Sequence, residues 1–147
     1  MKIEFLALCD SATVREGLLH ILGTPITRIY RPSLPAPLGV SVAAIFIFEA
    51  EDHNQLREFA IEVNSPNQTI QKGVGAVSVG PRPDKAESGE NIIYSPFVAS
   101  LMGVDTPEWG EHSVSISLEG GDHTRSFKFW VLPQEDQILP GGLQISP

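Results

Sequence analysis

The chain has 147 residues, of which 41% are hydrophobic, and a formal net charge of −8. This length predicts one domain that can bury a core, and the composition excludes a disordered or membrane-spanning protein. The acidic balance and the scattered basic residues argue against a nucleic acid or an anionic membrane as partner. Residues 5–9 are too short an apolar stretch for a secretion signal, so we expect a cytoplasmic protein.

The N-terminal part of the chain is expected to form short strands. Residues 2–9 predict the first strand, in which the single cysteine, Cys9, would be a small buried hydrophobe. Residues 10–13 (DSAT) have the composition of a turn, and Gly17 is expected to close it with positive φ. Strands follow over residues 18–22 and 26–31, and the proline-rich residues 32–37 predict a surface crossing.

Residues 40–49 (VSVAAIFIFE) contain the longest apolar run in the chain. Because side chains alternate along a strand, the bulky groups at 45–48 predict a central strand that is covered on both faces. The alternative, a helix, is disfavoured by the β-branched and aromatic residues and by the absence of capping residues. Residues 57–63 predict a half-buried strand, and the polar residues 49–55 between the two strands indicate an antiparallel pair.

The second half of the chain is also expected to be extended. Residues 68–79 predict a strand with a bulge or bend at Gly73 and Gly75. A long loop over residues 80–91 leads to a strand over 92–99, which Pro96 assigns to an edge or a bulge. After a second loop, residues 103–111, the alternating segments 112–118 and 124–132 predict a hairpin, because Gly120 and Gly121 suit its turn.

Eight or nine short strands with hardly any helical period indicate an all-β fold. We expect an antiparallel β-sandwich, in which an Ig-like, a C2-like and a jelly-roll strand order remain open. Residues 1–132 would form the single β-sandwich domain. Residues 133–147, rich in proline and glycine, would form a loosely ordered tail.

Two blocks of sequence resemble a known family. They are residues 3–23 (IEFLALCDSATVREGLLHILG) and residues 106–131 (TPEWGEHSVSISLEGGDHTRSFKFWV). The chain resembles a bacterial family of small uncharacterised proteins, a domain of unknown function. The first block shares with it a strand, an Asp-Ser-Ala turn, a glycine and an Ile-Leu-Gly ending. The second block shares a Pro-x-x-Gly loop before a closing hairpin. The resemblance implies a cytoplasmic β-sandwich and carries no catalytic residues.

No constellation of residues predicts catalysis. A metal site needs two or more ligands on one face, whereas His112 and His123 fall at opposite ends of the predicted hairpin and His53 falls in a polar segment. We therefore expect exposed turn histidines, no metal and no cofactor. The chain has no G-x-S-x-G elbow, and its glycine pairs lack the helix that a phosphate-binding loop requires. An enzyme would need at least two of His112, His123 and an acid to meet in one cleft.

Aromatic residues are the best candidates for binding. Trp109 lies in the polar loop 103–111, where it is either a contact anchor or a cap that folds back over the end of the sandwich. Trp130 falls on the strand face opposite the phenylalanines of the same segment and would form an exposed patch if that face is uncovered. Tyr30 and Arg31 lead into the proline-rich crossing and join this set of candidate binding residues.

Two hypotheses of function follow. The first is a non-enzymatic cytosolic interaction module that presents loops or an edge strand to a protein partner or to a second copy. The alternative is a β-sandwich that binds a small molecule or a carbohydrate through an exposed aromatic residue such as Trp109. The first hypothesis predicts a flat exposed patch, and the second predicts a concave pocket with a few convergent polar groups.

Overall fold

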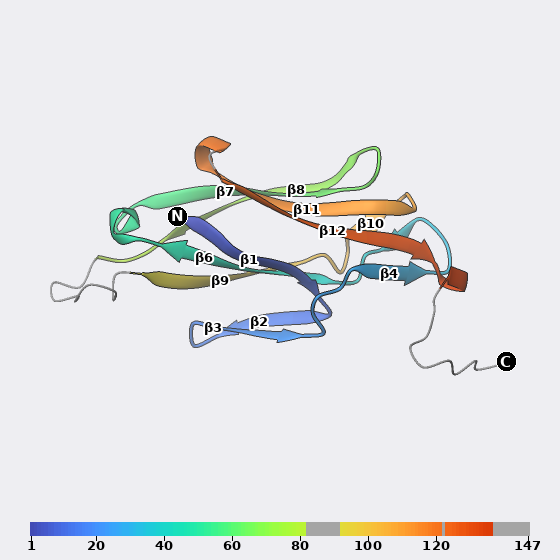
Figure 1. Cartoon of the computed structure of the whole chain (residues 1–147), viewed down its shortest axis with the longest axis horizontal. Coiled ribbons are helices and arrows are strands. Elements are labelled where there is room, and N and C mark those ends of the chain that lie inside the picture. Colours follow the sequence, from blue (N-terminus) through green and yellow to red (C-terminus); the bar gives the residue numbers. More distant parts are fainter. Residues whose placement is uncertain (82–91, 122, 137–147) are drawn as a thin grey trace.

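The computed structural model describes residues 1–81, 92–121 and 123–136, which form strands connected by turns (Figure 1). One sheet has three strands, β1 (Lys2–Cys9), β6 (Ser41–Phe48) and β9 (Ile93–Ser100), in the order β1-β6-β9. A second sheet has five strands in the order β4-β12-β11-β7-β8. Its strands are β4 (Arg28–Arg31), β7 (Leu56–Asn64), β8 (Thr69–Ser78), β11 (Gly110–Leu118) and β12 (Thr124–Pro133).

Two smaller sheets complete the fold. They pair β2 (Ser11–Arg15) with β3 (Leu18–Leu22), and β5 (Ala36–Pro37) with β10 (Asp105–Thr106). The single-turn 3₁₀ helices are η1 (Ala50–Asp52), η2 (Glu119–Gly121) and η3 (Gln134–Asp136). The all-β prediction is confirmed, with twelve strands in the described residues instead of eight or nine. No helix in the described part of the chain is long and apolar enough to cross a membrane.

The main core lies between the two larger sheets, which face each other in Figure 1. Phe46 of β6, Phe59 of β7 and Phe97 of β9 pack together, with ring centroids 5.0 to 5.9 Å apart. These rings come from both sheets and connect them. Because the glycine at position 75 lies opposite Phe59, the ring fits closely over the backbone of β8.

The longest apolar run forms the central strand that its pattern predicts. β6 lies between β1 and β9, and most of its side chains are buried. The predicted antiparallel pair of this run with residues 57–63 is wrong, because β7 belongs to the other sheet and pairs with β8 and β11. The polar residues between β6 and β7 contain η1, which carries the chain from one sheet to the other instead of closing a hairpin.

The prediction of a turn at residues 10–13 is also wrong, since residues 11–15 form β2. β2 pairs with β3, and the turn between them is at Glu16 and Gly17. Gly17 has the expected positive φ. Of the bulge or bend predicted at Gly73 and Gly75, the bulge is wrong, because the register of β7 and β8 shifts between Val63 and Asn64 instead. The glycines serve to admit neighbouring side chains, above all Phe59.

The hairpin predicted near the C-terminus is confirmed as β11 and β12. Gly120 and Gly121 both have positive φ in the connection between these strands. β9, with Pro96, lies at an edge of its sheet as expected. Among the named strands, one pairing departs from an antiparallel fold: β4 runs parallel to β12, which is possible because no hairpin joins these two strands.

Some expectations fall outside the described residues. Most of the loop predicted at 80–91 and most of the tail predicted at 133–147 lie there. Of that tail, Pro133 ends β12 and residues 134–136 form η3. Cys9 is fully buried, as predicted, and burial raises the pKa of its thiol.

Candidate functional site

The pairing of β4 with β12 brings two of the candidate aromatic residues to one surface. Tyr30 pairs with Leu132, and Trp130 pairs with Arg28 on the same two strands. Trp130 is 38% exposed on the outer face of its strand, as its alternation with the buried Phe129 predicts. An open concavity of about 380 Å³ lies here, and it is lined by Thr27, Arg28, Tyr30, Trp130, Leu132 and Asp136.

The side chain of Arg31 is held by hydrogen bonds to the backbone. Its guanidinium donates hydrogen bonds to three backbone carbonyls: Nε to Pro37 (2.8 Å), Nη1 to Tyr30 (2.8 Å) and Nη2 to Leu38 (2.5 Å). These bonds attach β4 to the proline-rich crossing. A second open concavity, of about 550 Å³, lies beside this crossing, and Tyr30 and Arg31 contribute to its lining. Arg31 therefore affects the shape of this surface by fixing the backbone carbonyls to which it donates hydrogen bonds.

Trp109 lies in a loop that a buried histidine organises. His112 is buried, and this burial lowers the pKa of its imidazole, which favours the neutral ring. The Nδ1–H of the neutral ring donates to the carbonyl of Gly110 at 2.9 Å, and Nε2 accepts from the Thr106 hydroxyl at 2.7 Å. The two residues bonded to His112 lie on either side of Trp109 in the sequence, so the loop backbone is fixed near the indole.

Glu108 fixes the same loop from the other side. Its carboxylate accepts hydrogen bonds from the Ser65 hydroxyl, from the Asn67 side-chain amide at 2.5 Å and from the Asn67 backbone N–H at 3.3 Å. The bonds from Ser65 and then from Asn67 lower the pKa of Glu108. The loop is thereby attached to the β7–β8 turn. Trp109 itself remains 38% exposed, so it does not fold fully into the core.

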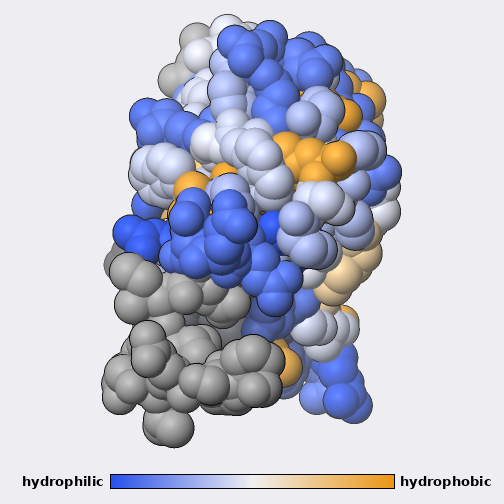
Figure 2. All heavy atoms as spheres, turned by 90° about the vertical axis from the view of Figure 1, so that its right-hand side faces the viewer, coloured by the Kyte–Doolittle hydropathy of each residue, from blue (hydrophilic) through white to orange (hydrophobic). Residues whose placement is uncertain are grey.

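Tyr30, Trp109 and Trp130 lie at the same end of the five-stranded sheet. Gly110, which follows Trp109, pairs with Val131, which follows Trp130. Trp109, just before β11, and Trp130, on β12, therefore lie next to the same register pair, and β4 adds Tyr30 on the far side of β12. Figure 2 faces this end of the molecule and shows a mostly hydrophilic surface with separate apolar patches. We call Tyr30, Trp109 and Trp130 the aromatic end.

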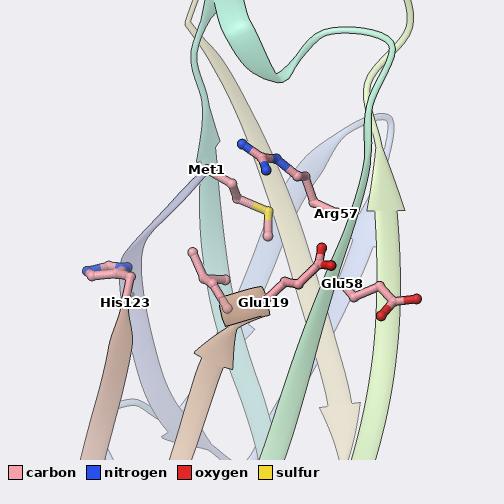
Figure 3. Close-up of a pocket in the computed structure, with 6 residues that line it drawn as sticks. Met1, Arg57, Glu58, Glu119 and His123 are labelled. Carbon is pink, nitrogen blue, oxygen red and sulfur yellow. The ribbon is translucent and has the colours of Figure 1, made fainter. Parts of the chain in front are cut away.

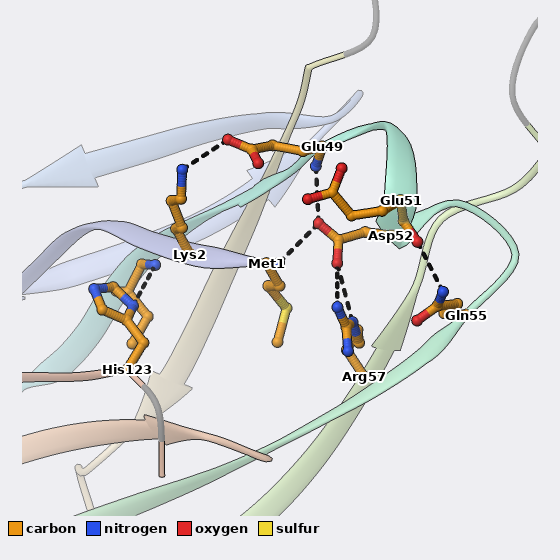
Figure 4. Close-up of polar contacts among 9 residues, drawn as sticks. Met1, Lys2, Glu49, Glu51, Asp52, Gln55, Arg57 and His123 are labelled. Carbon is orange, nitrogen blue, oxygen red and sulfur yellow. Dashed lines mark hydrogen bonds and ion pairs between the residues drawn. The ribbon is translucent and has the colours of Figure 1, made fainter. Parts of the chain in front are cut away.

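The opposite end of the fold carries a buried ion-pair network around Asp52 (Figure 4). Its carboxylate accepts from the Met1 amine at 2.7 Å, from the Glu49 backbone N–H at 2.9 Å and from Arg57 at 2.6 and 3.0 Å. Burial alone would raise the pKa of Asp52, but these hydrogen bonds outweigh it and lower the pKa to about 2. This network closes η1 and joins β1 to β7.

A small cavity of about 120 Å³ lies beside this network and is lined by Met1, Arg57, Glu58, Leu118, Glu119 and His123 (Figure 3). It is smaller than the roughly 300–1,000 Å³ of ordinary ligand sites. Nδ1 of His123 accepts the backbone N–H of Ile3 at 3.2 Å, which leaves the proton of a neutral ring on Nε2. His123 lines this cavity together with the acids Glu58 and Glu119, whereas His112 does not line it.

The expectation of exposed turn histidines is wrong: of the four, only His20 is exposed, and it lies in β3, while His123 is half-buried. His112 and His53 are buried, and Nδ1 of His53 lies 3.0 Å from the Gly80 carbonyl oxygen. The alternation of β11 does place His112 on the apolar face, and that signal predicts its burial. Asp52 gives no comparable signal, because its partners come from distant parts of the sequence. Among the described residues, no group of three or more His, Cys, Asp or Glu could hold a metal ion.

These features define an all-β protein with two facing sheets and an aromatic end at one end of the five-stranded sheet. A family model for a family of unknown function, DUF6941, matches residues 4–131, so the chain belongs to that family. The match includes the aromatic end and, of the Asp52 network, Glu49, Asp52 and Arg57 but not Met1. A search of the curated proteins finds no match to the chain.

Proposed function

We propose that this protein is a non-enzymatic interaction module, a cytosolic β-sandwich that binds a protein partner through its aromatic end. The observation that carries the proposal is that Tyr30, Trp109 and Trp130, from three separate parts of the sequence, lie at the same end of one sheet. Tryptophan and tyrosine are the residue types that most often dominate the energy of protein interfaces.

The rigidity of this surface supports the proposal. The hydrogen bonds of His112 and Glu108 fix the loop on both sides of Trp109. Arg31 fixes the backbone next to Tyr30, and Trp130 lies on a strand paired on both sides. A surface that is ordered before binding loses less conformational entropy when the partner arrives, so more of the contact energy contributes to affinity.

The experiment is quantitative affinity capture from an extract of the source organism. The wild-type chain is compared with Trp109→Ala, Trp130→Ala and the control Tyr94→Ala, which removes a 60% exposed aromatic side chain from β9 in the other sheet. If the proposal is right, the wild type and Tyr94→Ala capture the same protein in equal amounts, and both tryptophan variants fail to capture it. Equal retention by all four chains would contradict it.

A second candidate function, binding of a small polar molecule or carbohydrate, is favoured by the concavity beside Trp130. Its volume of about 380 Å³ lies within the usual range for ligand sites, and Arg28 and Asp136 supply charged groups next to two aromatic rings. In a Trp109→Phe background, Trp130 is the remaining tryptophan and its fluorescence reports binding. A saturable change on adding a glycan panel would support this candidate, and an unchanged signal would dispose of it for those ligands.

A further inference from the structure

The hairpin of β2 and β3 forms a sheet of its own, which contacts the three-stranded sheet through both of its strands at β9 and through β2 at β6. Its turn has positive φ at Glu16 (54°) and Gly17 (74°), the conformation of the primed turns that suit tight hairpins. β2 contacts β6 and β9, and β3 is the outer strand of the hairpin in Figure 1. Among the described residues β3 pairs with β2 alone, so its second edge has no strand beside it.

β3 is apolar on both faces. Leu19 and Ile21 are half-buried on one face, and Leu18 and Leu22 are 62% and 69% exposed on the other, on either side of His20. Strands that are apolar on both faces are normally covered on both, and an open edge with apolar side chains is a ready template for another strand. The composition of β3 is therefore that of a strand whose open edge is paired with another strand.

The order of residues in β3 indicates what that neighbour is. The strand reads Leu-Leu-His-Ile-Leu, which is nearly the same in both directions. In an antiparallel pair with a second copy centred on His20, Leu18 lies opposite Leu22, Leu19 lies opposite Ile21, and each apolar face continues into the same face of the other copy. We propose that two copies of this chain associate through β3, edge to edge, across a two-fold axis at His20.

The charge distribution agrees with self-association at this strand. The whole chain has a net charge of −8, whereas residues 11–22 contain one arginine and one glutamate and are neutral overall with neutral histidine. Two copies that meet at β3 therefore avoid bringing acidic surfaces together. β8 offers a longer open edge, but its sequence, TIQKGVGAVS, has no such two-fold symmetry.

The expected dimer is weak. A pair of five-residue strands buries much less than the roughly 1,600 Å² of a standard stable interface, so the dimer forms at high protein concentration and exchanges rapidly. It uses a surface other than the aromatic end. Trp109→Ala and Trp130→Ala should therefore leave it unchanged, whether or not the aromatic end binds a partner.

The decisive test is a cross-link at the proposed axis. Directly opposed residues of an antiparallel pair have Cα atoms about 4.5–5.5 Å apart, which is within disulfide range. His20→Cys should form a disulfide-linked dimer under mild oxidation, whereas Thr13→Cys, opposite His20 on β2 and one strand farther from the axis, should not. The native Cys9 is fully buried and does not compete. No cross-link, or equal cross-linking of both variants, would overturn the proposal.

Sedimentation of the uncross-linked chain gives an independent measurement. His20→Glu places two carboxylates face to face at the axis and should weaken the dimer by about tenfold or more, since opposed like charges are strongly unfavourable at an interface. Thr13→Glu adds the same charge to the same face of the hairpin and should have little effect. A wild type that is monomeric at every concentration, or equal weakening by both variants, would contradict the inference.

Discussion

Replacing Asp52 by Asn removes the carboxylate at the centre of the buried network. Asp52 is fully buried and holds both Arg57 and the Met1 amine, and its pKa is lowered from 3.8 to about 2. At about 1.36 kcal/mol per pH unit, this difference corresponds to roughly 2.5 kcal/mol of stability at neutral pH. We expect Asp52→Asn to lose this contribution.

The pH dependence gives the sign of the effect. Because the pKa of Asp52 is lower in the folded chain than in the unfolded chain, its stabilisation is present above about pH 4 and is lost as the pH falls to about 2. Urea unfolding of wild type and Asp52→Asn should differ by about 2 kcal/mol more at pH 7 than at pH 2, where Asp52 of the folded chain is about half protonated. Glu51→Gln, which removes an exposed neighbouring carboxylate, should stay within about 0.5 kcal/mol of wild type at pH 7. A wild-type to Asp52→Asn difference that does not change with pH would refute the reasoning.

Three further substitutions test the packing and the loops, each by urea unfolding at neutral pH. Gly75→Ala should lower the free energy of unfolding by about 1–3 kcal/mol, because the new Cβ would lie within 3.0 Å of three atoms of a buried phenylalanine ring. Gly73→Ala should lower it by less, because its Cβ would lie 3.3 Å from one methyl group. Arg31→Lys should cost about 1–2 kcal/mol, since an ammonium cannot reproduce the three bonds of the guanidinium. Thr106→Val should cost about 1–3 kcal/mol by leaving Nε2 of the buried His112 without a partner. Equal effects of the two glycine variants, or no loss in the other two, would count against these assignments.

The strands that the sequence predicts best are those whose patterns depend on local physics. β6 and the β11–β12 hairpin follow from a long apolar run and from strict alternation, and the bounds of β3 agree with the prediction. The placement of β6 and β7 in different sheets could not be obtained in this way, because two consecutive apolar strands bury their faces equally well within one sheet or across two. The η1 turn and the ion pair of Asp52 with Arg57 lie where the chain crosses from one sheet to the other.

The resemblance to an uncharacterised family is confirmed by the match to DUF6941, while the bacterial origin that it implied stays a prediction. The exposure of Trp130 could be predicted because alternation along one strand determines its face. Its meeting with Tyr30 could not, since the parallel pairing of β4 with β12 joins segments about a hundred residues apart and follows no hairpin. The buried bonds of His112 that organise the Trp109 loop likewise depend on tertiary contacts.

The most direct test of the proposed function is an oxidative footprint of the wild-type chain, free and in complex with the protein that it captures. The account predicts that Tyr30, Trp109 and Trp130 become protected from side-chain oxidation in the complex, while the exposed Tyr94 on the other sheet reacts as in the free chain. Unchanged oxidation of all three residues of the aromatic end in a stable complex would show that the partner binds elsewhere and would contradict the proposal.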